Sequence, residues 1–242
     1  MTQDEIRNSL DDNNRELLKD IEKTNDVHFV LDTTNQNYGC QLQNDNVSKP
    51  FFYIFIKLPI SQPSIYHELC HALIKVVFKN ENGRNMTTIG KQHHFYQAMI
   101  SNAPTVNAGW MGISNSCEHI MMYNKYINAG YYPEDFTEDN LNSYLFTTLP
   151  KLTGIKMISN EKDLREYLQY VISIVLDPRQ PPLKDSVEGE LKRISKELYD
   201  IVTNLRNNMN KISLCNTDAK KVSSAYLSFA KAFNKYLNNN FK

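Results

Sequence analysis

Two histidines and a glutamate stand at a spacing that can build a hydrolytic metal site. The segment is His67-Glu68-Leu69-Cys70-His71, in which the two histidines are four residues apart. Residues four apart on an α-helix lie one turn apart on the same face, so both imidazoles can reach one zinc ion at about 2.0–2.1 Å. Glu68 then points to a water on that ion and can act as a general base. The pattern predicts a zinc centre with His67 and His71 as ligands and Glu68 as the catalytic residue.

A catalytic zinc ion normally takes a third protein ligand and keeps one open position. The metzincin pattern would place Gly and His three and six residues after His71, but these positions hold Ile74 and Val77. The third ligand must therefore come from further along the chain. The best candidate segment, 115–126, offers Glu118 and His119 side by side. Adjacent helical residues point about 100° apart, so only one of them should face the metal, and we predict His119, with Glu118 as the alternative.

The motif, placed on an amphipathic helix that follows a strand, resembles the zincin metallopeptidases. The resemblance covers about residues 50–130, and its core is His67, Glu68 and His71. It implies a small sheet above the motif helix, an edge strand that binds extended substrate, and hydrolysis of a peptide or protein.

The candidate third ligand carries a second resemblance. His119 is followed by Met122 and Tyr126, three and seven residues on. This is similar to SprT-like and related bacterial proteins with three histidines. A Glu118 ligand would instead make the site similar to the glutamate zincins.

The elements that must position these residues follow from hydrophobic periodicity and from glycine and proline placement. They predict an α+β fold, with a small N-terminal sheet packed on the motif helix and a mostly helical C-terminal half. We expect a catalytic domain over residues 1–177 and a helical extension over 183–242, divided at the proline-rich stretch 178–182. The expected elements are a helix over 3–22, strands over 27–31, 38–42 and 51–58, the motif helix over 64–78, a turn at 80–85, a helix over 91–101, a loop over 102–112, and helices over 116–129, 161–176, 185–209 and 219–237.

Net charge and the lengths of apolar runs indicate which classes of partner to expect. Lys plus Arg and Asp plus Glu both number 27, so net charge gives no reason to expect nucleic acid or an anionic membrane as partner. No apolar run approaches the roughly 18 residues of a membrane helix, and the polar start of the chain lacks the features of a signal peptide. These observations predict a cytoplasmic protein. The four cysteines form no CxxC pair and are expected to be reduced, mostly buried thiols.

The remaining histidines and the paired tyrosines have weaker functional interpretations. His93 and His94 are expected to pack in the core or lie at the surface, with a ligand role as the alternative. His28 falls in a predicted strand and is expected to be structural. Tyr131 and Tyr132 could stabilise an oxyanion, although 14 tyrosines make their presence here a weak signal.

Three other hypotheses stay open. The first is a non-catalytic zincin-fold protein that binds metal or a partner, with residues 161–241 as the partner surface. The second is a protease associated with DNA repair, which the neutral charge and the lack of a CxxC…CxxC zinc ribbon disfavour. The third is a secreted toxin protease, for which the N-terminus gives no support. Three imidazoles also suit transition metals other than zinc.

Overall fold

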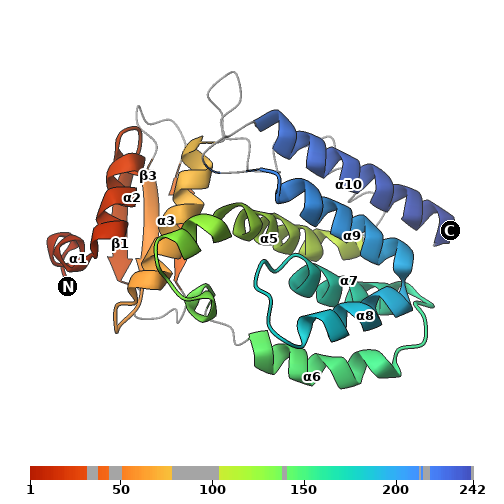
Figure 1. Cartoon of the computed structure of the whole chain (residues 1–242). Helices are drawn as coiled ribbons and strands as arrows, with labels where there is room; N and C mark the ends of the chain where they lie inside the picture. Colours follow the sequence, from red (N-terminus) through yellow and green to blue (C-terminus); the bar gives the residue numbers. More distant parts are fainter. Residues whose placement is uncertain are drawn as a thin grey trace. The chain divides into compact units, whose positions relative to one another are not determined.

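The chain has an α+β fold in which a small sheet is followed mostly by helices, as predicted (Figure 1). The computed structural model describes residues 1–31, 38–43, 51–77, 104–137, 141–212, 214 and 219–240. The expected turn at 80–85, the expected helix over 91–101 and the histidines His93 and His94 lie outside the described residues.

The contacts divide the chain into two compact units, and the division falls within one helix, between Met121 and Met122. The first unit contains α1 (Gln3–Ser9), α2 (Asp12–Glu22), β1 (Asp26–Leu31), β2 (Gly39–Gln43), β3 (Phe51–Ile56), α3 (Gln62–Val77), the end of α5 (Pro104–Asn128) and the short 3-10 helix η2 (Pro133–Asp135). The second unit contains the rest of α5 with α6 (Leu141–Gly154), α7 (Glu161–Val175), α8 (Lys184–Ile194), α9 (Lys196–Met209) and α10 (Ala219–Asn240).

The sheet of the first unit has the strand order β1-β3-β2, with β1 parallel and β2 antiparallel to the central strand. Strand side chains alternate between faces, and Phe52 and Ile54 of β3 are fully buried. Their register partners on β1, Val27 and Phe29, are buried on the same face. Helices α2 and α3 pack on this sheet. The motif helix therefore lies on a small N-terminal sheet, which is the arrangement predicted from the sequence.

Two predicted helices are each broken into two. The helix expected over 3–22 ends at Ser9, and α2 starts after Asp11, whose carboxylate accepts a hydrogen bond from the Asn14 backbone N–H at 2.8 Å. The helix expected over 185–209 breaks at Ser195, whose hydroxyl accepts from the Leu198 N–H. In both places a short polar side chain caps a new helix. The sequence prediction missed these breaks because the helical spacing of apolar residues continues across them.

The predicted loop over 102–112 is wrong from residue 104 onward. There the chain is already helical, because α5 begins at Pro104, a residue well suited to a first helical turn. Gly112 lies inside this helix, and a Cβ at that position would be 3.9 Å from Ile172 of α7, an ordinary van der Waals distance. Helix α6 was not predicted.

No described helix is both long and apolar enough to span a bilayer.

Helices α7, α8 and α10 of the second unit pack on α9, and α6 packs on α8. The apolar stripe of α9 is buried, as expected for a helix with a 3.6-residue apolar period. Its buried residues are Leu198, Ile201, Val202, Leu205 and Met209.

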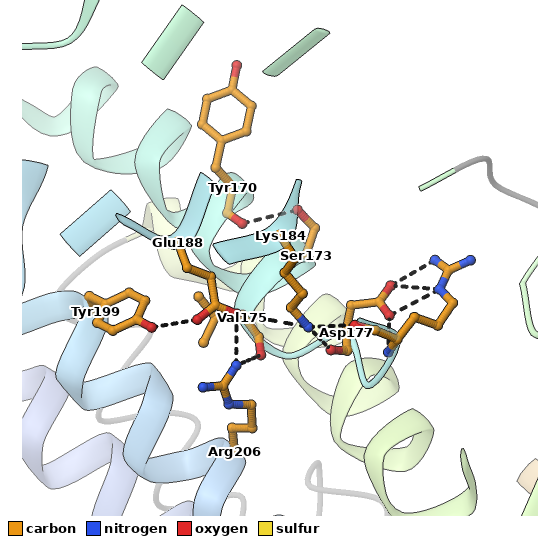
Figure 2. Close-up of polar contacts among 9 residues, drawn as sticks. Tyr170, Ser173, Val175, Asp177, Lys184, Glu188, Tyr199 and Arg206 are labelled. Atoms are coloured by element: carbon orange, nitrogen blue, oxygen red, sulfur yellow. Dashed lines mark hydrogen bonds and ion pairs between the residues drawn. The ribbon is translucent and has the colours of Figure 1, made fainter. Parts of the chain in front are cut away.

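A buried cation holds the proline-rich stretch 178–182 inside the second unit (Figure 2). The Lys184 side chain is 1% exposed, and its ammonium group donates to the backbone carbonyls of Asp177 and, at 2.9 Å, Arg179. The Arg179 guanidinium in turn pairs with the Asp177 carboxylate at 2.8 Å. The stretch predicted as a domain boundary is thus fastened to the start of α8.

The same cluster continues between α8 and α9. Glu188 of α8 lies 3.9 Å from the Lys184 ammonium and accepts a hydrogen bond from Arg206 of α9 at 2.8 Å. Arg206 also donates to the Val175 carbonyl at 3.2 Å, and Tyr199 donates to Glu188 at 2.5 Å (Figure 2). These contacts satisfy the charges that the packing of α7, α8 and α9 removes from water.

Candidate metal site

Hydrogen bonds at its first turn fix the direction of helix α3, which carries the motif. The Ser61 hydroxyl accepts from the Ser64 backbone N–H at 3.3 Å, and the Tyr38 hydroxyl accepts from the Ser61 N–H at 2.8 Å. The Asn14 side chain on α2 donates to the backbone carbonyl of Gln62 at 3.1 Å. The start of α3 is therefore tied both to Tyr38, which precedes β2, and to α2.

His67 and His71 lie next to each other on the buried side of α3. Their Nε2 atoms are 3.1 Å apart and their ring centroids are 4.9 Å apart. The two residues are only 7% and 5% exposed. Two nitrogens bound to one tetrahedral zinc ion at about 2.0–2.1 Å are roughly 3.3 Å from each other. The pair is thus spaced as two ligands of one ion need to be.

His119 on α5 completes a group of three. The ring nitrogens offered by His67, His71 and His119 all lie within 4.8 Å of one another, which is close enough to hold one metal ion. His119 is partly exposed, and its Nε2 lies 3.3 Å from the side-chain nitrogen of Asn115, one turn earlier on the helix. Three neutral imidazoles are a donor set that fits zinc, as well as other transition metals.

His119 and Tyr126 belong to the same helix, α5. This helix runs without a break from His119 into residues 122–128, which belong to the first unit. There the Tyr126 ring is fully buried and packs against the Tyr66 ring of α3 at 6.1 Å between centroids. His119 lies two turns before Tyr126 on the same helix.

Glu118, the alternative third ligand, is not among the three clustered residues. It is 7% exposed, and its charge adds to the effect of burial in raising the pKa values of the Cys117 thiol and the Tyr226 hydroxyl. Tyr226 belongs to α10, so Glu118 and Cys117 face the core of the second unit. The rotation of about 100° between neighbouring helical residues separates the carboxylate of Glu118 from the imidazole of His119.

Glu68 follows His67 in the sequence and does not belong to the group of His67, His71 and His119. Its side chain is partly exposed, whereas the flanking His67 and Leu69 are buried. The predicted role of Glu68 as a proton acceptor therefore stays a prediction.

An aromatic ring from a distant segment contacts His67. The Phe136 ring, in the segment after α5, meets the His67 ring at 4.9 Å and 61°. Phe136 is 1% exposed and also contacts the rings of Tyr123 and Tyr126, each at 5.0 Å. Sequence reasoning missed Phe136, because a contact across 69 positions leaves no local periodic signal.

The two cysteines that flank the ligands in sequence are buried thiols. Burial raises the pKa of both Cys70 and Cys117 to about 12, so each is a thiol at neutral pH. Cys40 is a free thiol of intermediate exposure. The described cysteines therefore match the expectation of reduced and mostly buried residues, while Cys215 lies outside the described residues.

Three residues with weaker functional interpretations, His28, Tyr131 and Tyr132, are not in the group of three histidines. His28 is on β1, where its ring contacts Phe51 at 5.3 Å and Tyr53 at 6.0 Å. The Tyr131 hydroxyl donates a hydrogen bond to the Asp11 carboxylate at 2.6 Å, and Tyr132 is 72% exposed.

Comparison with models of known protein families, with functionally characterised proteins and with solved structures found no match.

Proposed function

We propose that this chain is a zinc-dependent metallopeptidase with a zincin-like fold, acting on a peptide or protein substrate. The observation that carries the proposal is the group formed by His67, His71 and His119, whose ring nitrogens lie within 4.8 Å of one another. Two of the three come from an HExxH segment on a helix that packs on a small sheet. The glutamate of that segment supports hydrolysis rather than metal storage alone.

Each residue has a distinct role in this proposal. A zinc ion, when bound, supplies a Lewis acid that acidifies water and polarises a carbonyl oxygen. His67, His71 and His119 hold the ion as neutral imidazoles. Glu68 accepts the proton of the attacking water and then delivers it to the leaving amine nitrogen. Its side chain is partly exposed, which is compatible with contact to water.

The test separates metal binding from hydrolysis. Zinc content is measured by mass spectrometry, and cleavage is measured with labelled casein and a degenerate fluorogenic peptide library. Glu68→Gln is expected to keep about one zinc ion per chain and to lose cleavage by at least about 100-fold, because it removes the general base. His67→Ala is expected to lose both zinc and cleavage.

The outcomes distinguish the proposal from its alternatives. Full cleavage by Glu68→Gln would show that the mechanism is wrong. Wild-type protein that holds zinc but cleaves neither substrate would favour the non-catalytic metal-binding protein. Wild-type protein that holds no metal after loading would remove the metal site itself.

A further inference from the structure

The orientation of an imidazole decides whether its nitrogen can reach a shared metal ion. His67 can present its Nε2 next to that of His71, at 3.1 Å, only in a narrow range of side-chain torsions. Among the described residues of the first unit, the rings of His71 and Phe136 contact the His67 ring, each at 4.9 Å between centroids. One of these neighbours is a ligand, and the other is a hydrocarbon ring with no ligand atom.

Phe136 is itself held firmly. It is 1% exposed, and its ring makes edge contacts with Tyr123 and Tyr126, both on the last turns of α5. The interplanar angles are 83° and 78°, which is the edge-to-face arrangement that aromatic rings favour. Because the Phe136 ring is buried and fixed by these contacts, it limits the orientations that the neighbouring His67 ring can adopt.

The segment that delivers Phe136 is anchored as well. It leaves α5 through Gly130, whose φ of 87° is in the left-handed region that glycine adopts readily. The next residue, Tyr131, packs its ring on Tyr66 at 5.0 Å and donates its hydroxyl to Asp11 at 2.6 Å. The carbonyl of Ala129 accepts a hydrogen bond from a side chain of α2 at 2.9 Å. The segment is therefore tied to α2 and α3 before it reaches His67.

We propose that Phe136 is a positioning residue for the metal ligand His67. Its ring holds the imidazole in the orientation that directs Nε2 toward the position shared with His71. This inference rests on the proposed metal site and adds to it a residue outside the ligand set. It does not depend on the reaction that the site performs.

The test uses Phe136→Ala and Phe136→Leu in the full chain. The dissociation constant for Zn²⁺ is measured by competition with a chromophoric chelator, and the visible absorption spectrum is recorded for the Co²⁺-loaded protein. Phe136→Ala is expected to weaken Zn²⁺ binding about three- to tenfold, as the loss of one aromatic contact implies, and to alter the Co²⁺ bands. Phe136→Leu keeps the apolar volume and is expected to have a smaller effect.

Phe29→Ala is the matched control. Phe29 has the same size and the same 1% exposure and belongs to the same unit, but its ring lies under the Arg7 guanidinium, at 5.8 Å. This variant is expected to lower the free energy of unfolding, yet to keep its Zn²⁺ affinity within about twofold of the wild type.

The inference is overturned if Phe136→Ala binds Zn²⁺ within about twofold of the wild type with an unchanged Co²⁺ spectrum. It is also overturned if Phe29→Ala loses as much affinity, since the effect would then be general destabilisation. If Phe136→Ala does not fold, the Co²⁺ spectrum of Phe136→Leu decides: altered bands support the inference, because the flat ring that contacts His67 is gone, and bands identical to those of the wild type overturn it. Wild-type protein that binds neither metal would remove the proposed function together with this inference, whereas an unchanged variant of a metal-binding wild type removes the inference alone.

Discussion

The Tyr131 hydroxyl donates a hydrogen bond to the Asp11 carboxylate at 2.6 Å, across 120 positions of sequence. The other oxygen of the same carboxylate caps α2 by accepting from the Asn14 backbone N–H at 2.8 Å. The Asn14 side chain in turn contacts both the Tyr131 hydroxyl and Gln62 at the start of α3. Asp11 and Asn14 together thus connect the start of α2, the first turn of α3 and the segment after α5.

This connection predicts different effects for two neighbouring tyrosines. Tyr131→Phe removes a hydrogen bond to a charged group and is expected to lower the free energy of unfolding by about 1.5–3 kcal/mol, measured by urea denaturation. Tyr132→Phe is the control, because Tyr132 is 72% exposed and should change stability by less than about 0.5 kcal/mol. Equal effects of the two substitutions would contradict the role given to the Tyr131–Asp11 bond.

The third ligand can be tested by zinc content. His119→Ala is expected to weaken zinc binding more than about 100-fold, beyond the 10–100-fold typical of residues that only support a ligand. Glu118→Gln keeps the size of its side chain and is expected to retain zinc. Measurements on protein purified without added zinc check both. Loss of zinc from Glu118→Gln with retention in His119→Ala would place the ligand on the neighbouring residue.

The buried Lys184 predicts a pH dependence of stability. Burial lowers the pKa of its ammonium group from 10.5 to about 8. Between these two values the unfolded chain holds a proton that the folded chain has lost, so this group makes the free energy of unfolding rise with pH from about 8 to 10.5. Below pH 8 the ammonium is charged in both states, and its full burial cost is present.

Comparison with Lys184→Met isolates this contribution, since the two proteins share every other titratable group and the carboxylates and guanidinium groups that interact with Lys184 ordinarily stay charged between pH 7 and pH 9.5. The free energy of unfolding of the wild type, relative to Lys184→Met, is expected to rise by about 2 kcal/mol between pH 7 and pH 9.5. Urea denaturation at a series of pH values measures it. A difference that is constant or falls over this range would show that the Lys184 ammonium is not destabilised by its surroundings.

The described cysteines are expected to differ in reactivity. Cys70 and Cys117 are fully buried, whereas Cys40 is of intermediate exposure. Brief treatment of the folded protein with iodoacetamide, followed by peptide mass spectrometry, should label Cys40 at least about tenfold faster than the other two. All three should react alike in denaturant. Fast labelling of Cys70 in the folded protein would contradict the burial of the inner side of α3.

Local signals in the sequence were enough for the elements that carry the motif. Dense aromatic and β-branched residues predicted a strand over 51–58, and its counterpart β3 spans Phe51–Ile56. Apolar spacing predicted the motif helix, which is α3 over Gln62–Val77. The breaks at Asp11 and Ser195 and the early start of α5 were missed, because caps and prolines act over single turns while the apolar period continues through them.

What the sequence by itself determined is the chemistry that is available: two histidines four apart with a glutamate between them, and two further candidates at Glu118 and His119. Only the tertiary structure decided that His119 joins the pair, because the choice depends on the rotation of α5 about its axis. It also decided that Phe136 meets His67, a contact made by packing between distant segments. Helical periodicity fixes which residues share a face, but the packing of one helix against another fixes which face meets a partner.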